Sequence, residues 1–380
     1  MRNHRTRMVT LANLSVQSRH QVLRMALSIA IGLILATILI VSTSERPFTS
    51  LNYFFFAPIQ KVSYLNFWIQ KAVPLMFTGV AVCIMFSANQ FNLAMEGSFL
   101  MGGFIGGALT NIYIFPNNHL LGIIFGCIIG GLVGSVVTAI PAILQKLFNA
   151  SVMVTSLMMN YICLWYSCFL LFSVFKDPKT SKGTYSWTES GEEIMVARLK
   201  VGNDKLLIFY SLFVALLIVL FAWFLLYRTK FGFKLRTVGQ NGHFAKYVGI
   251  SVSGIAILSQ IIGGFIGGVG GACEIMSLYT NYRWVELTGY GWDGVTMAVF
   301  AKNNPRNVPI AALFISYLRA GAYVMSIKTG IQVDMTKVVE GVIILFLLAE
   351  KFLSGTYRKM IIKEAEREKA LQMAQQGGEQ

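Results

Sequence analysis

The sequence predicts an all-α polytopic membrane protein of about ten transmembrane helices, one or more of them short or broken. Of its 380 residues, 55% are hydrophobic and 13% are charged, which is about half the charged share of a soluble domain. The charges cluster between long apolar runs, and 97–145 is a run of 49 residues without Asp, Glu, Lys or Arg. An uncharged apolar stretch of 18 or more residues is long enough to span a bilayer. The runs are continuous rather than alternating, which excludes a transmembrane β-barrel.

Basic residues set the orientation of the predicted helices, because Lys and Arg beside a span prefer the cytoplasmic side. The segment 1–24 carries five Arg and no acid, and the loop 228–251 carries five basic residues and no acid. Both are predicted to be cytoplasmic. The polar loop 176–206 has six basic and five acidic residues, a balance that favours the outside. The charged tail 354–380 is predicted to remain in the cytoplasm.

These constraints place the transmembrane region at 25–353 and require an even number of crossings, because both ends of the chain lie inside. The short segment 290–301, about half of a normal span, supplies the tenth crossing. The predicted spans are 25–44, 63–87, 95–115, 119–143, 151–175, 207–227, 252–273, 290–301, 308–327 and 335–353.

Glycine recurs at a spacing of four residues inside several spans, a pattern that lets neighbouring helix backbones approach closely. The hexapeptide GGFIGG occurs twice, at 102–107 and at 263–268, once in each half of the chain. Transporters are often built from internal repeats with the substrate site at the repeat interface. The two copies indicate a possible internal duplication, and chance recurrence in a glycine-rich chain is the alternative.

Polar residues inside the apolar runs are the candidate substrate-pathway residues, because a carboxylate at membrane depth is costly unless it faces water, a partner or a pathway. Glu96 could instead be a structural acceptor for backbone N–H groups freed by a helix break, and Asn160 could be a hydrogen-bonding link between helices. The candidates are Asn92, Glu96, Thr155, Asn160 and Asp293.

Catalytic motifs are absent from the sequence. It contains no GxxxxGK[ST] phosphate loop, no HExxH and no nucleophile elbow, so we expect no catalytic residue, no cofactor and no metal site. The five cysteines lie in or beside apolar segments and are interpreted as small buried hydrophobic residues. The formal charge of +15 lies largely in predicted cytoplasmic segments near anionic lipid, so nucleic-acid binding is not needed to explain it.

Four segments resemble permease subunits of ABC importers of the nucleoside and simple-sugar type, a branched-chain amino acid and ribose permease-like family. They are 91–98 (FNLAMEGS), similar to FNxGxEGQ; 152–162 (VMVTSLMMNYI), similar to EVIxTxMLNYIA; 228–250, similar to RTxFGxxLRAVGxNPxAAxYAGI; and 291–305 (GWDGVTMAVFAKNNP), similar to GWDGIAVALLGxxNP. The order of the segments agrees with the predicted topology. Ala94 and Ser98 stand where the family usually has Gly and Gln, so its usual substrate is not assumed.

The resemblance implies an inward transport mechanism in the cell membrane, with no enzymatic activity in this chain. Two permease subunits would form the pathway, a cytoplasmic ABC ATPase would drive it, and an extracellular substrate-binding lipoprotein would deliver nucleosides or simple sugars. A short helix near 244–248 would seat in a groove of the ATPase. The residues that the resemblance assigns to this coupling element are Arg236, Gly239, Gln240, Asn241, Ala245 and Gly249.

The alternative function is a secondary transporter that works alone on an ion gradient. It would need a pair of ion-binding carboxylates deep in the spans, where Glu96 alone qualifies clearly, and it would give the basic loop 228–251 no purpose. A membrane-embedded enzyme lacks a catalytic cluster. The sequence leaves open which nucleoside or sugar is carried. It also leaves open whether the permease pair is identical, although the resemblance favours a second, different permease.

Overall fold

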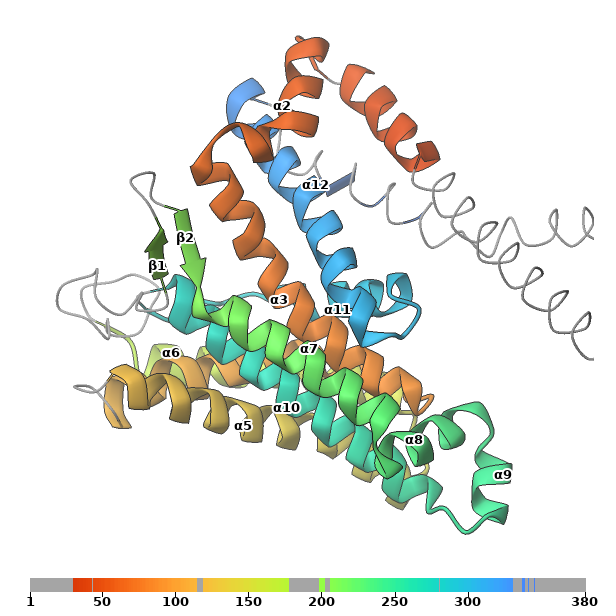
Figure 1. The fold of residues 1–380 in the computed structure, drawn as a ribbon. Helices are drawn as coiled ribbons and strands as arrows, with labels where there is room; N and C mark the ends of the chain where they lie inside the picture. Colours follow the sequence, from red (N-terminus) through yellow and green to blue (C-terminus); the bar gives the residue numbers. More distant parts are fainter. Residues whose placement is uncertain are drawn as a thin grey trace, which may run out of the picture. The chain divides into compact units, whose positions relative to one another are not determined.

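The computed structural model of the chain is mainly helical (Figure 1), and it describes residues 30–42, 44–114, 119–177, 198–201, 206–279 and 281–330, with single positions at 337, 338, 341 and 345. An apolar helix at Ala30–Ser42 precedes the labelled elements. These are α2 (Pro47–Gln60), α3 (Val62–Ser87), α4 (Met95–Met101), η1 (Gly102–Ile114), α5 (His119–Phe148), α6 (Val152–Ser173), β1 (Arg198–Val201), β2 (Leu206–Phe209), α7 (Tyr210–Arg228), α8 (Lys230–Gln240), α9 (Gly242–Tyr247), α10 (Val252–Leu278), α11 (Tyr290–Phe300), η2 (Pro305–Asn307) and α12 (Val308–Thr329).

The described part of the chain contains seven helical segments that are long and apolar enough to cross a membrane. They coincide with seven predicted spans, and the predicted all-α fold is confirmed. Of the predicted span 25–44, the structure describes an apolar helix at Ala30–Ser42, and α11 is the short eighth segment. The predicted span 335–353 lies outside the described residues apart from single positions, as do the two polar ends of the chain.

Two features depart from the plain helices that the sequence predicts. The span 95–115 is an α-helix only to Met101 and continues to Ile114 as a π-helix, a conformation that is rare beyond a single turn. A short antiparallel hairpin pairs Arg198 with Phe209 and Val201 with Leu206. It covers the end of the predicted outside loop and the first three residues of the predicted span 207–227, so that span begins as a strand and becomes the helix α7 only at Tyr210.

The chain divides into two compact units, Phe54–Val324 and a second unit made of Met1–Tyr53 with Met325–Gln380. In the second unit the hydroxyls of Ser44 and Ser50 lie 2.6 Å apart, at the start of α2. All contacts described below lie within Phe54–Val324.

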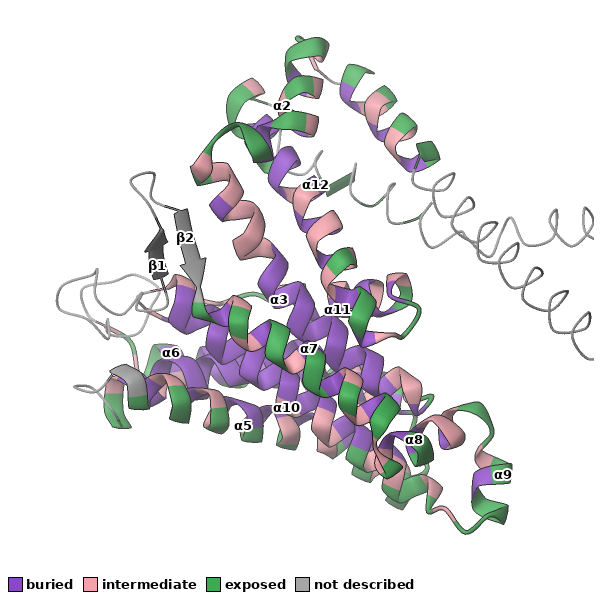
Figure 2. Cartoon of the chain, in the orientation of Figure 1, coloured by how far each residue is buried: buried purple, intermediate pink, exposed green. Residues whose placement is uncertain are grey.

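Burial separates an inner set of helices from an outer set (Figure 2). Every residue of α3 from 72 to 85 is buried, and so is every residue of α4. Helices α5, α6 and α7 instead leave rows of large apolar side chains exposed, such as Leu217, Leu220 and Phe221 of α7. A helix that is apolar on all sides suits a lipid environment, so the outer set has the surface of a membrane protein.

Glycines allow α4 and η1, α5 and α10 to pack backbone against backbone. A Cβ atom added to Gly102 would collide with the backbone of Gly268, and one added to Gly268 would collide with the carbonyl oxygen of Gly130. Both copies of the repeated hexapeptide, 102–107 and 263–268, therefore lie on facing helices at one contact. The predicted role of the glycine spacing in close packing is confirmed here, whereas the duplication stays a prediction.

Gly268→Ala is expected to destabilise this three-helix contact by at least about 1–3 kcal/mol, the usual cost of overpacking, because the obstructing atoms are backbone and cannot rotate away. Gly242→Ala is the matched control, since its Cβ would meet only a methyl group of Val252 at 3.8 Å. Thermal unfolding of the detergent-solubilised protein measures both. Equal melting temperatures for the two variants would contradict the prediction.

Candidate functional site

The break between α3 and α4, residues 88–94, is held together by the side chain of Asn92. Its Nδ2 donates to the carbonyl oxygen of Thr138 at 2.9 Å and to Oε1 of Gln260 at 2.6 Å, and its Oδ1 accepts from the N–H of Ala94 at 2.9 Å. Asn92 is fully buried. It therefore joins the break to α5 and α10 and satisfies a backbone group that the missing helix would have satisfied.

Helix α6 supports the same break through Asn160 and Ser156. Asn160 accepts from the N–H of Gly97 at 2.8 Å and donates to the carbonyl oxygen of Leu93 at 2.9 Å. The hydroxyl of Ser156 accepts from the N–H of Leu93 at 3.0 Å. These bonds show Asn160 as a link between helices, the structural alternative that the sequence left open.

The carboxylate of Glu96 binds the start of α11. Its Oε1 accepts from the hydroxyl of Thr288 at 2.8 Å and from the N–H of Gly289 at 2.6 Å, and its Oε2 accepts from the N–H of Gly291 at 2.6 Å. Glu96 is only 1% exposed. The first N–H groups of a helix have no partner within it, so Glu96 acts as an N-terminal cap supplied by another helix.

Two glycines make this contact possible. Gly289 has a φ of 82°, in the left-handed region that glycine adopts readily. A Cβ on Gly291 would lie 2.5 Å from the backbone nitrogen of Glu96, so the backbones of α4 and α11 touch. The starts of both short helices thus meet at one carboxylate, where the positive ends of their dipoles favour negative charge.

Asp293, in the first turn of α11, forms an ion pair with Arg319 of α12. The guanidinium donates in bidentate fashion, Nη1 to Oδ2 at 2.6 Å and Nη2 to Oδ1 at 2.7 Å. The side chains are 17% and 23% exposed, respectively. Helix α11 is therefore tied to α4 through Glu96 and to α12 through Asp293.

A third polar contact joins α3, α10 and α11. Lys71 donates to the hydroxyl of Tyr290 at 3.3 Å, and that hydroxyl donates to Oε1 of Glu274 at 3.4 Å. Glu274 is 2% exposed. The phenol thus lies between an ammonium group and a buried carboxyl group.

A cavity of about 370 Å³ lies beside these contacts. Its walls come from α3, from the non-helical residues 279 and 281–289 and from the start of α11. These non-helical residues contribute both aromatic and charged side chains, and burial, together with Glu274, raises the pKa of Tyr279, so that hydroxyl stays protonated. The lining residues are Lys71, Tyr279, Arg283, Trp284, Val285, Glu286, Leu287, Thr288 and Tyr290.

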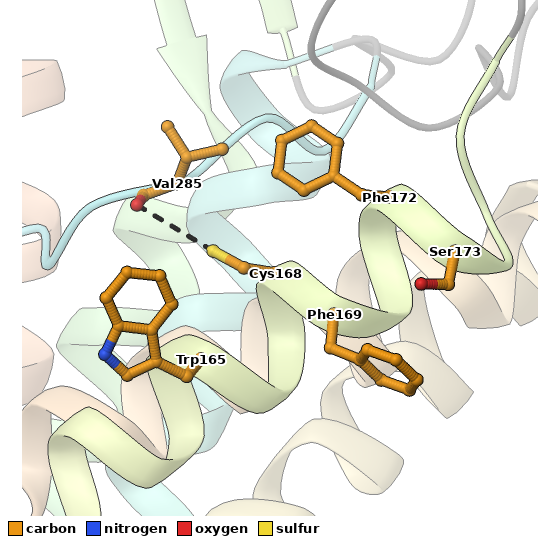
Figure 3. Close-up of a pocket in the computed structure, with 6 residues that line it drawn as sticks. All are labelled: Trp165, Cys168, Phe169, Phe172, Ser173 and Val285. Carbon is orange, nitrogen blue, oxygen red and sulfur yellow. Dashed lines mark hydrogen bonds between the residues drawn. The ribbon is translucent and has the colours of Figure 1, made fainter.

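A second cavity, of about 510 Å³, lies against α6 where the segment containing Val285 passes over it (Figure 3). The thiol of Cys168 points toward the carbonyl oxygen of Val285 at 3.8 Å. The lining is almost wholly apolar: Trp165, Cys168, Phe169, Phe172, Ser173 and Val285. Its aromatic side chains belong to the exposed outer face of α6, and none of the predicted pathway residues lines it.

Helices α8 and α9 form the basic loop, and a side chain caps the start of each helix. The Thr229 hydroxyl accepts from the N–H of Gly232 at 3.1 Å, and Asn241 Oδ1 accepts from the N–H of Phe244 at 3.0 Å. Gly249, with a φ of 81°, follows α9 at the turn that ends it. The short helix expected near 244–248 is present as α9, which begins two residues earlier and ends one residue earlier than expected.

Two of the small residues assigned to ATPase contact pack against other residues of this chain. Ala245 is fully buried. A Cβ on Gly239 would collide with the carbonyl oxygen of Ser87, so Gly239 permits α8 to pack against the end of α3. Exposed apolar side chains of this loop instead include Phe244, Tyr247 and Val248, with Tyr247 91% exposed.

The structure gathers Asn92, Glu96 and Asn160 around one helix break, with Asp293 on the helix that Glu96 caps. Thr155 is apart from them, because its hydroxyl donates to carbonyl oxygens within α6. Sequence reasoning missed Lys71 and Arg319. Each is a basic residue inside a predicted span, the same signal that drew attention to Glu96. Among the described residues, no group of three or more His, Cys, Asp or Glu side chains could hold a metal ion.

Ionisable side chains buried among membrane helices often mark the substrate or ion pathways of transport proteins, and the seven apolar helices make this a multi-pass membrane protein. Residues 63–348 match the family described as branched-chain amino acid transport system / permease component, and the chain belongs to this family of permeases. The resemblance inferred from the sequence is thereby confirmed.

Three relatives cover most of the chain. The guanosine ABC transporter permease protein NupP of Bacillus subtilis is 30% identical over 310 residues, covering 79% of this chain and 86% of that protein. The nucleoside ABC transporter permease protein NupB of Lactococcus lactis subsp. cremoris is 26% identical, covering 86% and 90%. The glucose ABC transporter permease protein TsgB13 of Haloferax volcanii is 23% identical, covering 86% and 87%.

The same bacteria contain further related permeases. The second guanosine permease protein of Bacillus subtilis, NupQ, is 21% identical over 66% of this chain, and the second nucleoside permease protein of Lactococcus lactis, NupC, is 25% identical over 69%. Permeases similar to this chain thus occur in pairs with matching names.

Proposed function

We propose that this chain is one of two different permease subunits of an ABC importer that moves nucleosides or simple sugars inward across the cell membrane. Support comes from the names of its relatives, which are nucleoside and glucose ABC permeases, and from the paired permeases of two bacteria. A separate cytoplasmic ATPase hydrolyses ATP, and an extracellular lipoprotein delivers the substrate. Membership of a family of permease components argues against the alternative function, an ion-coupled transporter that works alone.

The orientation follows from the basic loop of α8 and α9, which we place in the cytoplasm together with both ends of the chain. The loop has five basic residues and no acid, the composition that stays inside. The hairpin of β1 and β2 and the loop between α10 and α11 then belong to the outer side, and so do the residues of that loop that line the cavity.

The single observation that carries the coupling proposal is the exposed apolar surface of α9. Phe244 and Tyr247 of α9, and Val248 directly after it, are each more than half exposed, whereas Ala245 of the same helix is fully buried. Exposed aromatic residues on a capped helix are typical of docking surfaces. These side chains bind in a groove of the ATPase. Arg236, Gln240 and Asn241 determine the shape and charge of the loop. Gly239 permits its close packing against α3, and Gly249 permits the turn after α9.

The transport pathway passes the junction of α4 and α11. Asn92 and Asn160 fix the break between α3 and α4, Glu96 fixes the start of α11 against α4, and Asp293 ties α11 to α12. They act as positioning residues, because their polar atoms are engaged with backbone and side-chain partners. Thr155 stays a candidate pathway residue on α6, apart from this group, because its hydroxyl donates to the carbonyl oxygens of Ser151 and Val152.

Purification of the tagged protein from its own cells in mild detergent tests the assembly. Recovery of an ATPase, a second permease and a lipoprotein is expected, and deletion of this chain is expected to abolish uptake of the transported nucleoside or sugar. Recovery of the chain alone, with transport driven by an ion gradient after reconstitution, would refute the proposal.

Tyr247→Asp is expected to abolish coupling without affecting the fold, because Tyr247 is almost fully exposed and a charge in an apolar groove costs roughly 2 kcal/mol or more, about a thirtyfold loss of association. Co-purified ATPase and substrate uptake are the two measurements. Tyr247→Phe keeps the ring and serves as the control, with ATPase recovery near wild type. Unchanged ATPase recovery in Tyr247→Asp would place the docking surface elsewhere.

A further inference from the structure

The cavity between α3, the non-helical residues 279 and 281–289, and α11 has the chemistry of a small-molecule site. At about 370 Å³ it falls within the range of roughly 300–1,000 Å³ that such sites occupy. Three residues with hydroxyl groups, Tyr279, Thr288 and Tyr290, line it. The exposed Glu286 and the half-buried Lys71 bring opposite charges to it.

Buried carboxyl groups fix the lining hydroxyls from behind. Thr288 donates to Glu96 at 2.8 Å, and Tyr290 donates to Glu274 at 3.4 Å. The ammonium of Lys71 has three N–H donors, and one of them goes to the Tyr290 hydroxyl. The same ammonium lies 5.6 Å from the ring centroid of Phe67, at the wall of the cavity. A site whose lining groups are held by a second layer of hydrogen bonds is preorganised.

The charges around the cavity favour an uncharged ligand. Lys71 and Arg283 are the cationic lining residues, and Glu286 is the acidic one. The carboxyl groups of Glu96 and Glu274 lie one hydrogen bond behind the wall. Glu286 offsets one of the two positive side chains, so the lining carries a single positive charge in excess, which is small compared with the charge of a phosphate group.

The aromatic wall favours a ligand with a flat ring. Trp284 stacks on Phe99, with ring centroids 5.8 Å apart and planes 20° apart, and Tyr279 meets Trp284 edge-on at 5.9 Å. Phe99 is fully buried and supports Trp284 from the protein side. Stacking of a base on an aromatic side chain contributes to binding for every base, because each has a π face.

We propose that this cavity is a nucleoside-binding subsite of the permease itself, in which the base stacks against Trp284 while the sugar hydroxyls bind Lys71 and Glu286. The inference rests on the proposed function and narrows its substrate to neutral nucleosides. Selectivity then lies partly in this chain and not only in the lipoprotein that delivers the substrate.

The test uses the intact transporter, with the chains that co-purify, in lipid nanodiscs without the lipoprotein. Equilibrium binding of tritiated guanosine and tritiated uridine is measured, with guanosine monophosphate and glucose as competitors. Lys71→Met and Trp284→Leu are each expected to weaken binding roughly tenfold. The matched controls are Lys146→Met and Trp165→Leu, an exposed lysine on α5 and an exposed tryptophan on α6, and both should bind as wild type does.

Binding that resists both Lys71→Met and Trp284→Leu, or that glucose or the monophosphate competes for as well as guanosine does, would overturn the subsite. A melting temperature for each variant shows whether the fold persists, and Lys71→Met decides the question if Trp284→Leu unfolds. If wild-type nanodiscs bind no nucleoside while cells still need this chain for nucleoside uptake, the subsite is wrong and the proposed function stands. Nucleoside uptake that does not depend on the chain would refute both.

Discussion

Glu96→Ala is expected to lower the free energy of unfolding by about 3 kcal/mol or more and to abolish transport. The change leaves the Thr288 hydroxyl and the N–H groups of Gly289 and Gly291 facing an empty space in the protein interior. Each buried donor that loses its acceptor costs about 1–3 kcal/mol. The side chain is almost fully buried, so little water is at hand to replace the carboxylate.

Glu96→Gln tests whether the negative charge of the side chain is needed, because it removes the charge and keeps the shape. The amide keeps the size of the side chain and one acceptor oxygen, but its NH₂ group faces N–H or O–H donors on the other side. We therefore expect a smaller loss of stability than for Glu96→Ala, with assembly retained and transport reduced. Glu45→Gln, at an exposed glutamate before α2, is the control and should change neither property.

Three measurements decide between these outcomes: the amount of protein in the membrane, its melting temperature in detergent, and substrate uptake by cells. Wild-type stability in Glu96→Ala would show that the three hydrogen bonds do not hold the start of α11. Normal uptake in Glu96→Gln at wild-type protein levels would show that transport does not depend on the charge of the cap.

The helices could be predicted from the sequence because the bilayer imposes a length and a composition that any crossing segment must meet. Seven of the predicted spans agree with helices of the described region. The same constraint identified Glu96 and Asn92, since polar residues in apolar runs are visible without a structure. Arg319 was equally visible, as a basic residue within a predicted span, and was overlooked.

Partners in space could not be predicted. Glu96 binds the N–H of Gly291, 195 residues further along the chain, and nothing in a local pattern records that distance. Helix rotation was also out of reach: Thr155 and Ser156 are adjacent and both polar, yet only Ser156 binds the break. In the coupling loop, the small residues indicated a close contact but not the partner of that contact. Gly239 packs against Ser87 of the same chain rather than lying on an exposed surface.

The second large effect is expected at the ion pair of α11 and α12. Asp293→Ala deprives the Arg319 guanidinium of a bidentate carboxylate in the middle of a membrane helix, where a charge without this compensation is costly. Breaking a buried pair by removing one partner typically costs 3–5 kcal/mol, and the partial exposure of both side chains places the expected loss near the lower end, about 3 kcal/mol.

A double-mutant cycle isolates the pair from the other contacts of its members. Asp293→Ala combined with Arg319→Met removes both charges and fills part of the space with an apolar chain, so most of the lost stability should return. Melting temperatures of the two single variants and the double variant give the coupling energy, and additive losses would contradict the argument. Recovery of stability without recovery of transport would show that the pair does more than hold the helices together. In that case α11 would be folded and still capped by Glu96, yet the protein would not transport its substrate.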